Sequence, residues 1–392
     1  KSQSGDKKSP MKNKKQLGQF FTENTDYILS DFEKYIIGKN ITDPFAGNKD
    51  LLKWAIKNNC NNAKGFDIDE KYIDNKVVLK NDSLQNPKKY DFVLTNPPYL
   101  YQNKLEDNSV LKDSKHTDLY QISLEKIMNS KEGIVIVPIN FLSAENSKYI
   151  RDIFLNKFNI IKVNYFTQQV FKDTTYNVMA FYYKKKEKNS AKMQMDLHIL
   201  PENKKITINI YEKYNWQIGG EFLNKINSFG NKLKIKRLEE EDLGKGSVLV
   251  KVAHNHLKNF REFKVDENTF SRLKKNIVLL KAIDTGTDKG KISLEDIRKY
   301  NLHALVGIKT SRNQIYLIFP ENISIREQQE LISLFNEELN RERTKYHSLF
   351  MTNFRDNNRK RISFNFAYKM INYIYFSKMK GEQNARRQST LF

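Results

Sequence analysis

Short apolar runs alternate with more polar stretches along the first half of the chain. Residues 50–58, which follow the first of these runs and its turn, are predicted to form a helix. We predict strands at 40–43, 63–69, 77–80, 91–95 and 177–183. Apolar strands joined by helical segments are typical of a mostly parallel sheet covered on both faces. The pattern therefore predicts a doubly wound α/β domain.

The second half of the chain has a different pattern. Alternating strands are expected at 206–210 and 248–252, mixed apolar runs at 302–320, and an amphipathic helix at 324–347. The charged run 184–191 is interpreted as a connector, with a solvated hairpin inside one domain as the alternative. We therefore predict a flexible tail at 1–15, a first domain at 16–190 and an α+β domain at 191–392.

The amino-acid composition limits the classes of partner that we expect for this chain. The chain has 392 residues, with 68 Lys and Arg against 46 Asp and Glu, which gives a formal charge of +22. Such an excess favours a polyanion such as nucleic acid. The sequence has one cysteine, no apolar run of membrane-spanning length and no signal-like start. We therefore expect a cytoplasmic protein, without a membrane partner.

The tetrapeptide Asn96-Pro97-Pro98-Tyr99 follows the predicted strand at 91–95. The Asn96 side-chain oxygen and the Pro97 carbonyl can accept hydrogen bonds from the two hydrogens of a planar amine, and the two prolines stiffen the turn. Tyr99 offers an aromatic face on which a flipped base can stack. The alternative is an ordinary turn after a strand.

Acidic residues end the other predicted strands. Asp43 begins a turn of small and special residues that runs to Gly47, and Asp67 lies 20 residues after Gly47. At this spacing a carboxylate can accept hydrogen bonds from ribose hydroxyls. Asp82 follows the third strand, where it can reach the adenine amine of a cofactor. Since the carboxyl ends of parallel strands share one edge of the sheet, these residues predict a nucleoside-cofactor site.

Residues 16–184 resemble the gamma class of S-adenosylmethionine-dependent DNA amino methyltransferases, the group of the Taq-type modification enzymes of restriction-modification systems. The motifs follow the order of that class. They comprise 16–22, Asp43 to Gly47, Asp67, Asp82, Asn96 to Tyr99, a helix at 118–126, a strand at 133–138, and Val170-Phe171 followed by 177–181. The chain has Asn48-Lys49 where the class usually carries a second glycine, and Ser83-Leu84 where it often has an aromatic residue.

The resemblance implies a Rossmann-like class I methyltransferase fold and S-adenosylmethionine as the cofactor. It assigns Asn96, Pro97, Pro98 and Tyr99 to catalysis, and Phe171 beside Tyr99 to stacking on the flipped base. The cofactor-binding residues it implies are Phe20, Phe21, Thr22, Asp43, Pro44, Phe45, Ala46, Gly47, Asp67, Ile68, Asp82, Ser83 and Asn96.

The second half contains no recognised catalytic set, which fits a DNA target-recognition domain. In the basic, aromatic stretch 350–366, we expect Arg355, Arg359, Lys360 and Arg361 to contact DNA. The alternative is a basic helix start whose aromatic residues pack in the core. His254 and His256 lack partner ligands, so no metal site is predicted.

The sequence thus favours methylation of N6 of a flipped-out adenine in double-stranded DNA. Alternatives are an RNA adenine, a protein glutamine or cytosine N4 as the target. The resemblance leaves room for a companion restriction endonuclease and implies no stable complex with it.

Overall fold

The computed structural model describes residues 24–100, 109–112, 114–172, 177–285, 290–355 and 359–381. The chain forms two compact units, Lys1–Ile218 and Gly219–Phe392, and each is described by itself. No helix in the described part is long and apolar enough to cross a membrane.

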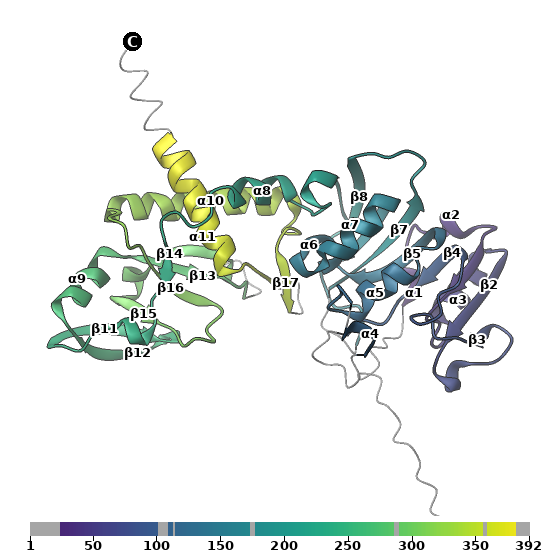
Figure 1. Ribbon diagram of the computed structural model, residues 1–392, viewed down its shortest axis with the longest axis horizontal. Helices are drawn as coiled ribbons and strands as arrows, with labels where there is room; N and C mark the ends of the chain where they lie inside the picture. The colour runs from purple at the N-terminus through teal and green to yellow at the C-terminus, as the bar shows by residue number, and fades with distance from the viewer. Residues whose placement is uncertain are drawn as a thin grey trace, which may run out of the picture. The chain divides into compact units, whose positions relative to one another are not determined.

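Unit 1 is built on a nine-stranded sheet in the order β3-β2-β1-β4-β5-β7-β6-β8-β9 (Figure 1). The first five strands in this order are parallel, and β7 runs antiparallel to both β5 and β6. The strand order reverses between β1 and β4, which is where doubly wound sheets bind ligands. The predicted fold class, a doubly wound, mostly parallel sheet of the class I methyltransferase type, is confirmed. The strands are β1 (Asn40–Asp43), β2 (Asn62–Asp67), β3 (Val78–Lys80), β4 (Tyr90–Thr95), β5 (Ser130–Pro138), β6 (Phe158–Phe166), β7 (Val178–Lys185), β8 (Lys192–Leu200) and β9 (Lys204–Tyr211).

Amphipathic helices cover the sheet. α3 (Asp50–Lys57) buries Leu51, Leu52, Trp54 and Ala55 and packs against β1, β2 and β4. α5 (Leu119–Lys126) contacts α7 (Lys148–Lys157), which also packs on β6 and lies over the strands in Figure 1. The helices and the sheet bury apolar side chains against each other, so β4 and β5 are almost completely buried.

The first unit extends beyond the predicted boundary at 190. β8 alternates exposed and buried residues and pairs in parallel with β6, and β9 pairs with β8. Residues 191–218 therefore add to the sheet, and the charged run 184–191 forms the end of β7 and the solvated connection to β8. The division falls instead between Ile218 and Gly219.

Unit 2 contains strands and helices around its own core, which includes Val250, Val252, Leu273, Leu305 and Tyr316. Its sheets have the orders β10-β16-β13-β14, β12-β11-β15 and β17-β18. The strands are β10 (Lys236–Arg237), β11 (Val248–His254), β12 (His256–Val265), β13 (Val278–Lys281), β14 (Ser293–Asp296), β15 (Ala304–Val306), β16 (Gln314–Ile318), β17 (Thr352–Arg355) and β18 (Arg359–Arg361).

The longest helix of the described part of unit 2, α10 (Ile325–Tyr346), matches the amphipathic helix predicted from the sequence. It begins at a capping box, in which the Ser324 side chain accepts from the Glu327 amide and the Glu327 side chain accepts from the Ser324 amide. The remaining helices are α8 (Gly220–Asn227), α9 (Glu267–Lys275) and α11 (Phe364–Tyr373), with a π-helical continuation, η9 (Ile374–Met379).

Candidate active site

The chemically suggestive residues of unit 1 gather at the carboxyl ends of neighbouring strands. β1 ends at Asp43, β2 at Asp67 and β4 at Thr95, and Asn96 follows directly. Because β1 pairs in parallel with both β2 and β4, these three strand ends lie at one edge of the sheet.

Asp43 links the turn after β1 to the end of β4. Its Oδ1 accepts a 2.6 Å hydrogen bond from the Thr95 hydroxyl and a 3.0 Å bond from the Phe45 amide. Burial raises the pKa of the Asp43 carboxyl to about 7, and the two hydrogen bonds oppose that shift. Thr95 directly precedes Asn96, so this hydrogen bond ties the start of the tetrapeptide to the turn predicted to bind the cofactor. The sequence analysis did not single out Thr95. The sequence signal that could have identified Thr95 is a hydroxyl residue at the end of an apolar strand.

The same turn is fixed to the end of β2. Gly47 takes φ +47° and donates its amide to Asp67 Oδ2 at 2.8 Å, while Asp67 Oδ1 accepts from the Asp69 amide at 2.9 Å. A Cβ at Gly65 would lie 2.5 Å from the Cβ of Ala46, so only glycine lets the turn lie this close to β2. Burial raises the pKa of Asp67.

Asn48 and Lys49 stand where the class that the chain resembles usually has its second glycine, and Lys49 is the residue with the unusual backbone. It adopts a left-handed conformation, with φ +65°, immediately before α3 begins. Its ammonium bonds Asp74 Oδ2 at 2.8 Å. The chain thus keeps a sharp turn into the helix at a non-glycine residue, at some cost in backbone strain.

The turn after β3 is held by its own side chains. Asp82 Oδ1 accepts from the amides of Leu84 and Gln85, at 3.0 and 3.2 Å. Asn81 is buried and donates to the Ser83 hydroxyl. The predicted residues Asp82 and Ser83 therefore lie in a defined turn beside β2, whereas Ile68 is 50% exposed.

The tetrapeptide lies largely in the interior. Asn96, Pro97 and Tyr99 are buried and Pro98 is half-buried. The ring of Tyr99 lies 6.4 Å from that of Phe171, between centroids, with the planes tilted by 45°. The structure thus brings together the two residues predicted to stack on a base. A base between two parallel rings needs about 7 Å of separation, so the two rings as they lie here leave no room for a base between them.

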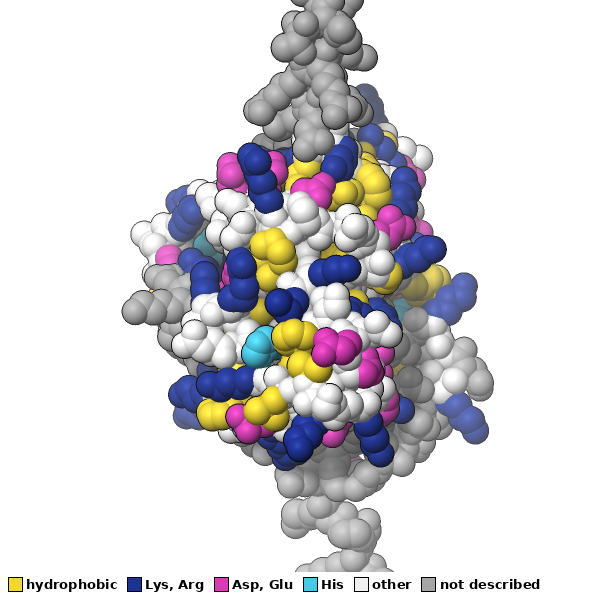
Figure 2. Space-filling view, turned by 90° about the vertical axis from the view of Figure 1, so that its left-hand side faces the viewer, with side chains coloured by type: hydrophobic (Ala, Val, Ile, Leu, Met, Phe, Trp, Pro, Cys, Tyr) yellow, Lys and Arg dark blue, Asp and Glu magenta, His cyan; other side chains and the backbone are white. Residues whose placement is uncertain are grey.

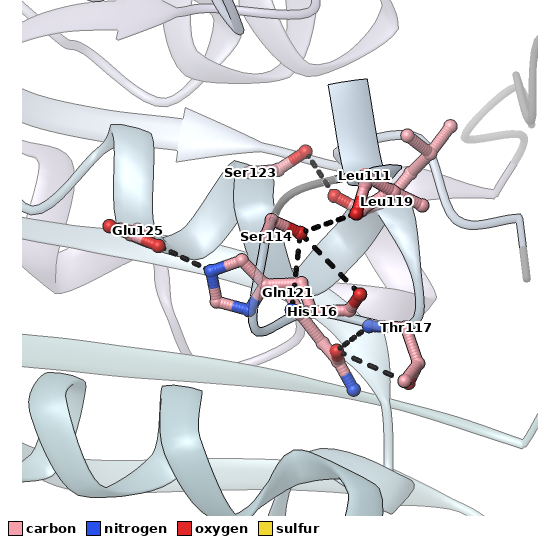
Figure 3. Close-up of polar contacts among 8 residues, drawn as sticks. All are labelled: Leu111, Ser114, His116, Thr117, Leu119, Gln121, Ser123 and Glu125. Atoms are coloured by element: carbon pink, nitrogen blue, oxygen red, sulfur yellow. Dashed lines mark hydrogen bonds and ion pairs between the residues drawn. The ribbon is translucent and has the colours of Figure 1, made fainter. Parts of the chain in front are cut away.

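Side-chain contacts hold residues 114–117, which directly precede α5 (Figure 3). His116 is buried and its Nε2 contacts Glu125 Oε2, while the Thr117 amide donates to Gln121 Oε1 at 2.8 Å. The Leu119 amide donates to the Leu100 carbonyl at 3.2 Å, which fastens α5 directly to the residue after Tyr99. His116 lies in a loop, and this contact anchors its buried ring.

Several predicted residues lie elsewhere or outside the described part. Phe20, Phe21 and Thr22 fall outside the described residues, as does the side chain of Arg355. Lys360 differs from the expectation of a DNA contact. It is 1% exposed, because β18 packs against Ala282 and Asp284, while Arg361 is exposed and Arg359 half-buried. Within the described residues no group of three His, Cys, Asp or Glu side chains could hold a metal ion.

Comparison with protein families relates the first unit to a known class. Residues 6–171 match the model of the Eco57I restriction-modification methylase family. This segment contains the turn after β1, both buried carboxylates and the tetrapeptide. A comparison with curated protein sequences found no match.

Solved structures give distant likenesses. The type I restriction enzyme EcoKI M protein shares 14% identity with a TM-score of 0.35, over 43% of this chain and 47% of that one. A type I restriction-modification methyltransferase subunit from Streptococcus thermophilus shares 16%, with a TM-score of 0.34, over 46% and 47%. The type IIG restriction endonuclease BpuSI shares 10%, with a TM-score of 0.41, over 86% and 57%. The chain thus spans about half the length of these proteins, and the likenesses are too distant to bear on activity.

Proposed function

We propose that this chain is a DNA methyltransferase of a restriction-modification system that transfers a methyl group from S-adenosylmethionine to N6 of an adenine. The observation that carries the proposal is the link from Asn96, through its neighbour Thr95, to Asp43 at the switch point of the sheet. This link supports the proposal, because it joins the residue before the tetrapeptide to the turn that we propose binds the cofactor.

The residues around that turn fit S-adenosylmethionine. Each Asp67 oxygen already accepts one backbone amide, and a carboxylate has about four acceptor positions, so both oxygens can still accept from ribose hydroxyls. Asp82 stands at the next strand end as a partner for the cofactor's adenine amine. When bound, S-adenosylmethionine supplies the methyl group as an electrophilic sulfonium.

The tetrapeptide would then prepare the target base. The Asn96 Oδ1 and the Pro97 carbonyl accept the two N6 hydrogens, which draws the nitrogen toward tetrahedral geometry and frees its lone pair. Tyr99 and Phe171 stack on the extruded adenine, and this stacking offsets the few kcal/mol that flipping costs. The roles of Phe20, Phe21 and Thr22 at the cofactor remain part of the proposal.

Three other targets share this chemistry: an RNA adenine, a protein glutamine and cytosine N4 in DNA. The match of residues 6–171 to restriction-modification methylases supports DNA, and the charge of +22 supports a nucleic acid over a protein. Asn as the first residue of the tetrapeptide favours adenine over cytosine, where Ser is commoner. A companion endonuclease and a place in the bacterial cytoplasm belong to the same proposal.

The test is to incubate the protein with S-adenosylmethionine carrying a tritiated methyl group and, separately, with plasmid DNA, total RNA or cell extract. Hydrolysis and chromatography then identify the labelled product. The proposal predicts label in N6-methyladenine from DNA. Label confined to N4-methylcytosine, to RNA or to protein would overturn it.

A further inference from the structure

In the antiparallel hairpin formed by β11 and β12, β12 is mainly exposed. β12 is the edge strand of its sheet. Seven of its ten residues (256–265) are exposed, Leu257 and Phe263 are half-buried, and Val265 is buried. Such an edge is open to a partner, except at Leu257, whose amide already donates to Gln314 Oε1 at 3.1 Å.

The hairpin has one side in the core and one side in solvent. Val250 and Val252 of β11 point into the core of unit 2, and Phe263 of β12 packs against it. The opposite side presents Leu249 and Lys251, paired across the strands with Lys264 and Glu262. On that side Phe260 is 56% exposed, and the Lys251 ammonium lies 4.4 Å from the centre of its ring.

The exposed charges of the hairpin are mainly positive. Lys258, Arg261 and Lys264 of β12 are exposed beside a single acid of that strand, Glu262. Basic side chains continue in the adjoining loop, where Lys309 and Arg312 are exposed and the Ile308 amide donates to the side chain of Asn255 in the hairpin turn. Figure 2 shows this end of the structure, with Lys and Arg side chains spread among apolar ones.

We propose that the β11–β12 hairpin is a DNA-binding ribbon, which enters the major groove of the duplex. The proposal rests on the proposed function, since it supplies the duplex contact that a DNA methyltransferase needs. It assigns phosphate contacts to Lys258 and Lys264 and an apolar contact with bases or sugars to Phe260.

The dimensions of the hairpin suit this partner. Two paired strands lie about 5 Å apart, and with side chains they fill a groove about 12 Å wide. A ten-residue strand spans roughly 30 Å, close to one turn of the duplex. Lysines on an edge strand also discourage pairing with a second protein strand, which favours a polyanion over another copy of this chain.

The test uses the full chain and measures binding to a duplex of plasmid-derived sequence over a series of KCl concentrations. The double variant Lys258→Ala/Lys264→Ala removes two phosphate contacts, so the salt slope should fall by about 1.8. The matched control is Lys225→Ala/Lys232→Ala, which removes two exposed lysines elsewhere on unit 2. The control should keep the wild-type slope. Equal slopes for the two double variants would overturn the inference.

Position-specific crosslinking gives an independent readout. A benzoylphenylalanine in place of Phe260 should crosslink to the duplex, whereas the same group in place of Phe376, another exposed phenylalanine of unit 2, should not. Crosslinks from position 260 to a second protein chain only, or equal competition by double-stranded RNA, whose major groove is narrow and deep, would contradict the proposal.

The outcomes separate this inference from the proposed function. If the wild-type protein methylates adenine in DNA and the hairpin variant binds as the control does, only the hairpin inference fails. If the wild-type protein does not methylate DNA at all, the proposed function fails, whatever the salt slopes are.

Discussion

The Thr95 hydroxyl donates a 2.6 Å hydrogen bond to the buried Asp43 carboxyl, joining the end of β4 to the end of β1. Thr95→Val removes the donor but keeps the shape of the side chain. We expect it to lower the free energy of unfolding by about 1–3 kcal/mol, because Asp43 loses a buried partner. Urea unfolding measures this change.

Thr95→Ser is the matched control, since it restores the hydroxyl. It should recover most of the methylation rate that Thr95→Val loses through displacement of the adjacent Asn96. If serine and valine at this position behaved alike in both stability and rate, the hydrogen bond would have no positioning role.

Asp43 also predicts a pH dependence. Burial raises the pKa of its carboxyl in the folded protein to about 7, above the ordinary value of 3.8 for an aspartate. The contribution of Asp43 to stability is therefore fully present below about pH 4 and is lost as the pH rises through 7. The loss is at most about 1.4 kcal/mol per pH unit.

Asp43→Asn removes the titrating group and keeps an acceptor for Thr95. Between pH 5 and 7 the wild-type protein should lose stability relative to this variant, as followed by urea unfolding at each pH. A difference between the two proteins that stays constant over this range would show that Asp43 does not titrate there.

Phe171 packs against Tyr99 at 6.4 Å in the described structure, and we predict that it stacks on the extruded base. Phe171→Ala should weaken binding of DNA with 2-aminopurine at the target position by about 1–3 kcal/mol, and lower the fluorescence increase that reports flipping. Phe171→Tyr keeps an aromatic face and should behave nearly as the wild type. Unchanged binding by the alanine variant would remove Phe171 from the base site.

Lys360 is buried, and its burial lowers the pKa of the ammonium to about 7. A lysine whose pKa falls in the folded state costs stability below that pKa, and the cost fades as the pH rises from 7 toward 10.5. We therefore predict that Lys360→Met is more stable than the wild type at pH 6, with a difference that shrinks by pH 9. Its DNA salt slope should match the wild type, and a lower slope would restore Lys360 as a phosphate contact.

The strands that carry the site could be predicted because their signals are local. The apolar run before Asn96 and the acids at 67 and 82 predicted β2, β3 and β4 to within about two residues, and α10 followed from its periodicity and capping residues. We expected Phe171 to lie beside Tyr99 of the tetrapeptide, and the structure places the rings of these two residues side by side.

The missed features depend on contacts distant in sequence. The boundary predicted at residue 190 does not separate the units, because β8 pairs in parallel with β6, the strand that precedes β7 in the sequence. A charged run gives no information about such pairing. From the sequence, Lys360 was expected to be an exposed basic residue, because nothing in residues 350–366 indicates that β18 packs against residues 282–284. The hydrogen bond from Thr95 to Asp43 spans 52 residues and likewise has no local pattern.

The central claim is that Asn96 prepares an adenine in DNA for methylation. The most direct measurement is single-turnover formation of N6-methyladenine in duplex DNA by the wild type and by Asn96→Ala, with S-adenosylmethionine binding measured for both by calorimetry. We predict that the variant binds the cofactor with similar affinity and methylates at least about 10²-fold more slowly. N6-methyladenine formed by Asn96→Ala at a near-normal rate would contradict the account.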